Sequence, residues 1–271
     1  MPASRSTVAL AAGMAVAAAF LWAAYYPLVL RGAEGVAPIA LLAWPFVVGG
    51  TGFSLAAVAQ GHGAPLRKLW TDRASWGRVG LLVAMQGLVL ASTYLAGGID
   101  TSLLSLLGDV VFTPLLLVVL FSEGLGRIRT PRFAAGIAVC TAGSILTIAA
   151  GGAVRPLSGW GIAVAVLVPP TIAVFFLATA RATVRTPTTA VAGHAVLAAG
   201  CVTLVAGLLL PGGASSLFHL ALPAIGALLA IGVTSFWIGQ WLYFVAIQRA
   251  GLVLPAVLMC GIPVFTLLLS W

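Results

Sequence analysis

Charged side chains and cysteines are what this 271-residue chain has least of. Charged residues make up 7 % of it and hydrophobic residues 62 %, whereas an average soluble domain is about 25 % charged. This composition excludes an ordinary soluble protein. The longest polar stretch, 61–78, is too short to fold alone, and its leucines and tryptophans among basic residues predict an interfacial segment. The sequence therefore predicts a single integral membrane domain.

The few cysteines carry no sign of redox or metal chemistry. Cys140, Cys201 and Cys260 lie in apolar stretches without CxxC spacing, so they are expected to pack as small apolar residues. A phosphate-binding loop with its lysine is absent from the sequence, as is a His/Cys/Asp cluster. We therefore expect no metal, no cofactor and no ATP-driven step.

What the chain has in abundance is apolar stretches long enough to cross a bilayer, which takes about 20 residues per helix. The first follows Arg5 in the manner of an uncleaved signal sequence, but its apolar run is too long for a removable one. It is therefore assigned to the fold. Nine helices are predicted, at residues 8–30, 36–58, 77–97, 102–121, 131–150, 159–179, 188–210, 221–245 and 250–270.

The basic residues are distributed unevenly over these helices. Only Arg31 and Arg155 fall on one face of the membrane. The opposite face receives Arg5, Arg67, Lys68, Arg73, Arg78, Arg127, Arg129, Arg132, Arg181, Arg185 and Arg249. By the positive-inside rule this second face and the N-terminus are cytoplasmic, in a multi-pass protein of the cell membrane. The net charge of +8 then faces anionic lipid headgroups, and no nucleic-acid partner is expected.

The chain also contains an internal repeat. Three pairs of landmarks lie 149 residues apart, namely Pro38 and Pro187, Tyr94 and Tyr243, and Pro114 and Pro263. The predicted halves are 1–150, with five helices, and 151–271, with four. Because five is odd, the second half must be inverted relative to the first, as the charges also indicate. Such duplication recurs in secondary transporters, with the substrate site where the repeats meet.

Two long segments resemble a known family. Residues 94–151 have a Tyr at a helix end, a short loop, a helix with a mid-span Pro, a Glu at its end and a final helix rich in small residues. Residues 243–271 resemble the same part of a second copy. The chain is similar to EamA-type members of the drug/metabolite transporter superfamily. This resemblance implies an all-α membrane protein of two inverted five-helix repeats, with a tenth helix expected within about 30 residues after Trp271. The alternative is a naturally short member of the family with nine helices.

Asp109 is the deepest ionisable residue, about 10 Å into its predicted helix. Ser102 and Ser105 share its helix face, together with Thr113. A carboxylate at this depth should face water or a partner. Asp109 is therefore a candidate for binding a cationic or amino group, or for exchanging a proton. The alternative is a structural bond to a neighbouring helix.

Aromatic and amide side chains supply further candidates for a substrate site. They are Trp22, Trp44, Gln86, Trp237, Gln240 and Trp241. The tryptophans could stack on an amphipathic substrate or anchor the helices at the lipid interface. Gln86 could equally form an interhelical hydrogen bond. For Tyr25, Tyr26 and Tyr94, which lie near helix ends, interfacial anchoring is the preferred interpretation.

His194 is a second candidate for proton coupling beside Asp109, because an imidazole ordinarily titrates near pH ~6.5. A hydrogen-bonded packing role is the alternative. Prolines inside spans free backbone carbonyls and bend helices. The candidates for hinge positions are Pro114, Pro263, Pro169 and Pro170.

The resemblance implies a secondary active transporter of an amino acid, amphipathic metabolite or drug. Export by alternating access, with proton antiport, is expected. A non-transporting scaffold or receptor is the alternative. An intramembrane enzyme is disfavoured because an aspartyl protease needs two carboxylates and only Asp109 qualifies. The small residues of 131–150 permit close packing within the chain or across a homodimer, and the oligomeric state stays open.

Overall fold

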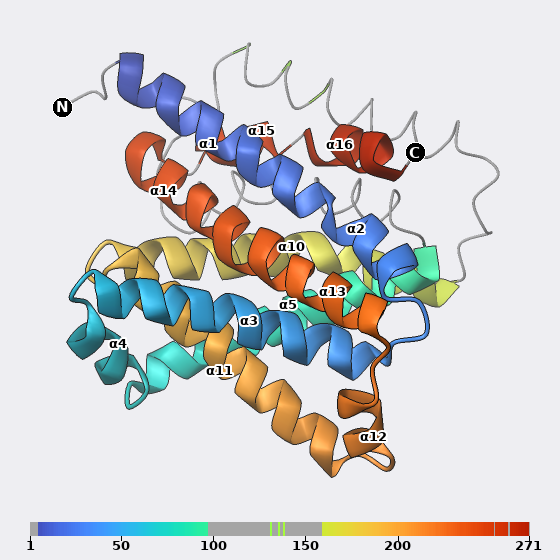
Figure 1. Cartoon of the computed structure of the whole chain (residues 1–271). Helices are drawn as coiled ribbons and strands as arrows, with labels where there is room; N and C mark the ends of the chain where they lie inside the picture. Colours follow the sequence, from blue (N-terminus) through green and yellow to red (C-terminus); the bar gives the residue numbers. More distant parts are fainter. Residues whose placement is uncertain are drawn as a thin grey trace.

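The described residues form an all-helical bundle without strands (Figure 1). The computed structural model describes residues 5–96, 131, 135, 138, 159–251, 253–259 and 261–270. Within these ranges, five helical stretches are long and apolar enough to cross a membrane, namely Ser6–Gly32, Pro38–Ala59, Arg73–Leu95, Thr188–Leu209 and Leu222–Ala250. The predicted class, an all-α membrane-embedded protein, is confirmed at this level.

Seven of the nine predicted spans fall on described residues, and each coincides with helix. The first comprises α1 (Arg5–Ala23), α2 (Tyr25–Pro27) and the π-helix η1 (Leu28–Gly32). Then come α3 (Pro38–Ala59), α5 (Arg73–Ala96), α10 (Gly159–Thr183) and α11 (Thr188–Leu209). The eighth comprises α13 (Leu222–Ile231), the π-helix η3 (Gly232–Gly239) and α14 (Gln240–Ala250). The predicted span 102–121 and most of 131–150 lie outside the described residues.

The predicted prolines affect their helices differently. Helix α10 runs through Pro169 and Pro170 without interruption. The last span instead divides into α15 (Val253–Leu258) and α16 (Gly261–Ser270). The break precedes Pro263, whose nitrogen has no hydrogen to donate to a preceding carbonyl. Ile262 instead donates to the carbonyl of Met259 at 2.9 Å. Pro114 lies outside the described residues.

Two short helices lie in the connections between spans. Helix α4 (Gly63–Leu69) falls in the predicted interfacial segment, with Arg67 and Lys68 exposed and Leu69 buried. This is the amphipathic pattern of a helix that lies along an interface. Helix α12 (Gly213–Phe218) follows α11 at the opposite end of the bundle (Figure 1).

Helices α3 and α11 pack antiparallel along their whole length, with glycines at the crossing. A Cβ at Gly50 would overlap the backbone of Leu197, and a Cβ at Gly200 would overlap Val47. Farther along, Gly193 faces Ser54 and Gly207 faces Ile39. Small residues at such positions let two backbones approach closely, which is how helices associate in membranes without a hydrophobic driving force.

The remaining helices are arranged around this central pair. Helix α1 packs on α14, and α10 packs on α5. Helix α3 also contacts η3, and α11 also contacts α5. The buried face of α1 is made of alanines, including Ala11, Ala15 and Ala18, each fully buried. These small side chains allow the close contact with α14.

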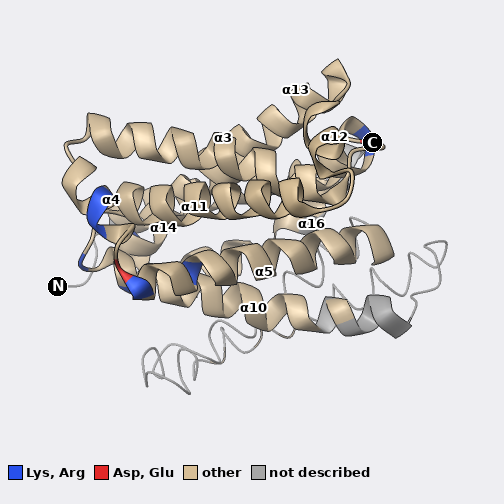
Figure 2. Cartoon of the chain, turned by 90° about the horizontal axis from the view of Figure 1, so that it is seen from below, with Lys and Arg blue, Asp and Glu red and all other residues tan. Residues whose placement is uncertain are grey.

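Most basic residues of the described chain gather at one end of the bundle, together with α4 (Figure 2). Arg31 belongs to η1, which directly follows α2 at the end opposite α4 (Figure 1). We call the end that holds α4 the basic end. This arrangement matches the uneven distribution expected from the sequence.

Candidate functional site

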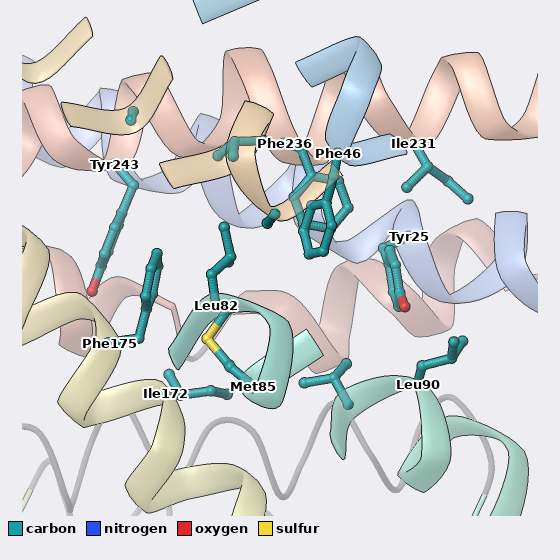
Figure 3. Close-up of a cluster of buried hydrophobic side chains, with 14 of the residues drawn as sticks. Tyr25, Phe46, Leu82, Met85, Leu90, Ile172, Phe175, Ile231, Phe236 and Tyr243 are labelled. Atoms are coloured by element: carbon teal, nitrogen blue, oxygen red, sulfur yellow. The ribbon is translucent and has the colours of Figure 1, made fainter. Parts of the chain in front are cut away.

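A cavity of about 80 Å³ lies between helices that come from both halves of the sequence. Figure 3 shows Met85 of α5 and Ile172 of α10 extending toward each other beneath Phe236. The lining residues are Trp22, Tyr25, Tyr26, Met85, Gln86, Val89, Ile172, Phe176, Ser235, Phe236, Gln240 and Ile262. Among the residues predicted to bind substrate, Trp22, Gln86 and Gln240 therefore line one cavity.

The polar groups of this cavity are uncharged in the part of the chain that the structure describes. Gln86 comes from α5, whereas Gln240, only 4 % exposed, begins α14. The Tyr25 hydroxyl is buried without a hydrogen-bond partner there, and the Ser235 hydroxyl reaches only the carbonyl of Leu21, at 3.5 Å. Buried polar groups usually have partners. These groups can therefore accept or donate hydrogen bonds to a bound molecule.

Aromatic rings form the wall on the side of α10 and α14. Trp22 stacks on Phe176, with ring centroids 5.5 Å apart and planes at 28°. Tyr243 lies 5.0 Å from Trp22 and 4.8 Å from Phe176. The Trp22 indole nitrogen donates to the carbonyl of Ser235 at 2.8 Å. Because the indole is held by this bond, the wall is pre-formed and suits an apolar or aromatic part of a ligand.

Six of the twelve cavity residues form pairs with a nearly constant separation in the sequence. Tyr26 and Phe176 lie 150 residues apart, and Gln86 and Ser235 lie 149 apart. Trp22 and Ile172 are likewise 150 apart. Residues at matching positions of the two predicted halves thus contribute to one cavity.

The other predicted site residues lie elsewhere. The indole nitrogen of Trp44 donates to the carbonyl of Leu217 at 2.9 Å, and Trp44 borders a separate apolar cavity beside α12 and α13. Trp237 packs against Gly52 of α3, and Trp241 is 38 % exposed. The prediction that Trp237 and Trp241 bind the same substrate assumed that residues four apart share one face of an α-helix. Residue 237 lies instead in the π-helix η3, which changes the faces that residues present.

Four further predicted residues are not among the described residues that line the cavity. Asp109, Ser102 and Ser105 lie outside the described residues. His194 is described and does not line the cavity; it is fully buried on α11, between Trp70 and Trp76.

The expected interfacial position of the tyrosines in the first span is wrong. Tyr25 and Tyr26 were expected to anchor the helix at the interface, but each is only 6 % exposed and lines the cavity. Tyr94 is 42 % exposed. Proximity to a helix end did not reveal burial, because the first span continues to Gly32. The separation of 150 residues between Tyr26 and Phe176 was a usable signal in the sequence.

Comparisons with known proteins show the fold but no activity. No protein-family model and no curated protein matches the chain. A solved structure described only as "Crystal structure of protein" is similar, with a TM-score of 0.77 and 23 % sequence identity over 98 % of this chain and 88 % of that one. At this identity the likeness shows a shared fold alone.

Proposed function

We propose that the chain is a secondary active transporter, which moves a small organic metabolite through the membrane by alternating access. One observation carries the proposal. A cavity lined by amides and aromatic rings lies inside a membrane-embedded bundle, where equivalent residues of two sequence halves meet. Secondary transporters commonly place their substrate sites at such a junction. The resemblance of the sequence to EamA-type drug/metabolite transporters supports the same conclusion.

The proposed architecture is a pair of inverted repeats, and the packing supports it. Gly50 meets Leu197 as Gly200 meets Val47, and both Gly50/Gly200 and Val47/Leu197 are 150 residues apart. The contact is thus repeated when the halves are exchanged. The contact of α1 with α14 likewise corresponds to that of α10 with α5. Because α3 and α11 are antiparallel, a two-fold axis that relates them runs across the helices, as inversion requires.

The proposed orientation places the basic end and the N-terminus in the cytoplasm, in accordance with the positive-inside rule. The amides of Gln86 and Gln240 then bind the polar part of the substrate, while Trp22 and Phe176 contact its apolar part. Asp109 is proposed as the residue that binds an amino group or exchanges a proton during export. The break before Pro263 is proposed as a bend point.

The function is tested by comparing extracellular metabolites from cells that overproduce the wild-type protein or a variant. Gln240→Ala removes an amide from the cavity, so a compound exported by the wild type should fall by about 10-fold or more, as a loss of roughly 1.5–3 kcal/mol of bonding predicts. The matched control is Trp241→Phe, which changes an exposed side chain on the same helix. The identified compound is then offered to the purified protein in liposomes.

The liposome measurement separates a transporter from a scaffold. Uptake by the wild type that is reduced by Gln240→Ala, and unaffected by Trp241→Phe, is expected. No exported compound and no uptake would instead favour the scaffold. In the same assay, normal transport and unchanged pH dependence in Asp109→Asn would remove both roles proposed for Asp109.

A further inference from the structure

The basic end of the bundle contains a buried histidine enclosed by two tryptophans. His194 lies on α11 and is 0 % exposed. Its ring centroid is 5.0 Å from that of Trp70 at the end of α4 and 5.6 Å from that of Trp76 on α5, both edge-to-face. The Trp76 indole nitrogen donates to the carbonyl of Trp70 at 3.1 Å. The two indoles are thus fixed to each other and close over the histidine.

Neither ring nitrogen of His194 has a hydrogen-bond partner within the described chain. A neutral imidazole carries one donor and one acceptor. Burying such groups unpaired costs about 1–3 kcal/mol each. This arrangement persists only because edge-to-face contacts with two indoles and the surrounding packing offset the cost. Any state that lets water reach the ring recovers those hydrogen bonds.

Among the described residues, one cation and one carboxylate act on the His194 ring, namely Arg78 and Asp72. On α5, Arg78 faces it and donates to the hydroxyl of Ser75 at 2.7 Å. Asp72 accepts from the same hydroxyl at 2.6 Å, and this bond is the main reason that the pKa of Asp72 is lowered. Asp72 is thus already engaged. The other titratable groups on described elements packed against α11, or next to them in the chain, include His62, Arg67, Lys68, Arg73, Tyr94, Arg181, Tyr243 and Arg249.

At this end α11 also packs Ala190 and Val191 against Leu69 and makes several polar contacts. The Thr189 hydroxyl donates to the amide oxygen of Gln60 at 3.1 Å and lies 3.2 Å from Nδ1 of His62. The amide of Gln248 on α14 donates to the hydroxyl of Thr188. Such bonds can exchange readily with water. The apolar part of the contact between α11 and the α4–α5 segment is therefore centred on the His194 cluster and Leu69.

The cavity is separated from the basic end by a layer of buried side chains. Tyr243 and Phe244 on α14 and Leu82 on α5 are each at most 1 % exposed, and each lies between the cavity-lining residues of its helix and the basic end in the sequence. Trp76 lies beyond Leu82 on α5, so the His194 cluster joins α11 to α5 on the basic-end side of this layer.

We propose that His194, Trp70 and Trp76 form a proton-binding latch that holds the basic end closed and releases it when His194 takes up a proton. In the closed state the neutral ring packs between the indoles. A proton on the ring would leave an unpaired charge buried at the same place, which is costly. Protonation therefore favours the open state, where water solvates the imidazolium. Only the interpretation of opening as a transport step rests on the proposed function.

The latch is tested by measuring one distance at two pH values. Ala64 on α4 and Val184 in the α10–α11 connection are both exposed. Each is replaced by Cys in a variant whose native cysteines are changed to Ala, and both receive nitroxide labels. Electron–electron distance measurements in lipid nanodiscs then compare about pH 7.5 with about pH 5.5. If an open-state imidazole has its ordinary pKa of about 6.5, the ratio of open to closed states rises about 10-fold.

Three variants make the outcome decisive. His194→Phe keeps an aromatic ring that cannot titrate, so the distance distribution should become independent of pH. His194→Gln supplies a second non-titrating side chain should the first fail to fold. His219→Phe, at an exposed histidine near the opposite end, should respond like the wild type. An unchanged distribution in the wild type, or a pH response that persists in both His194 variants, overturns the latch. Neither reading depends on knowing a substrate, so the proposed transport can fail independently.

Discussion

At the scale of single residues, side chains stabilise the structure by forming hydrogen bonds to backbone groups of neighbouring helices. The indole of Trp22 is the clearest case. It stacks on Phe176 and donates to the carbonyl of Ser235, which belongs to the π-helix η3. One side chain thus joins the first span to the eighth while forming part of the cavity wall.

Trp22→Phe should therefore destabilise the protein although it keeps an aromatic ring. The Ser235 carbonyl loses its donor, and we expect unfolding to become easier by about 1–3 kcal/mol. The measurement is thermal unfolding of the purified protein in detergent. Trp241→Phe is the matched control, because Trp241 is 38 % exposed. Equal melting temperatures for the two variants would contradict a structural role for the Trp22 bond.

At the scale of helices, the crossing of α3 and α11 depends on the absence of side chains. A Cβ at Gly50 would meet the backbone of Leu197, which cannot move aside as a flexible side-chain end could. Phe46 and Phe53 on α3 are fully buried on either side of this contact. The two helices are therefore fixed in register by steric fit.

Gly50→Ala should force these helices apart and lower stability by about 1–3 kcal/mol, the usual cost of overpacking. Gly80→Ala on α5 is the matched control, because nothing lies within 4 Å of a Cβ built there. The control should be neutral or stabilising by up to about 1 kcal/mol, since Ala favours helix over Gly. The measurement is thermal unfolding of both purified variants. A Gly50→Ala protein as stable as the Gly80→Ala control would exclude the close contact of α3 and α11.

Helix positions could be predicted from sequence because a bilayer demands long apolar runs, and α3 and α11 fall within a few residues of the predicted spans. Which face of each helix is buried could not be predicted from the sequence. Trp241 and Gln240 were both candidates for the substrate site, yet Gln240 is buried at the cavity and Trp241 is 38 % exposed. Tyr25 was expected at the interface and is buried, because only the packing of other spans decides which side of a helix is covered.

At the scale of the whole molecule, the uneven charge predicts its orientation in the membrane. Ala64 on α4 and Ala214 on α12 are both exposed and lie at opposite ends of the bundle (Figure 1). Single cysteines at the two positions, in a cysteine-free background, are treated with a membrane-impermeant maleimide. In intact cells we expect labelling of Ala214→Cys but not of Ala64→Cys, and the reverse in inside-out vesicles. The opposite pattern would place the basic end outside.

The π-helical segments η1 and η3 of the described chain each occur in only one of its two halves. The counterpart of η1 lies within α10, and the counterpart of η3 lies within α5, both regular α-helices there. Two identical inverted halves would make the inward- and outward-facing forms equal in energy. In the proposed architecture of inverted repeats, each π segment belongs to one half alone, so this equality is lost, and we expect the protein to favour one of the two forms before any ligand or ion gradient acts on it.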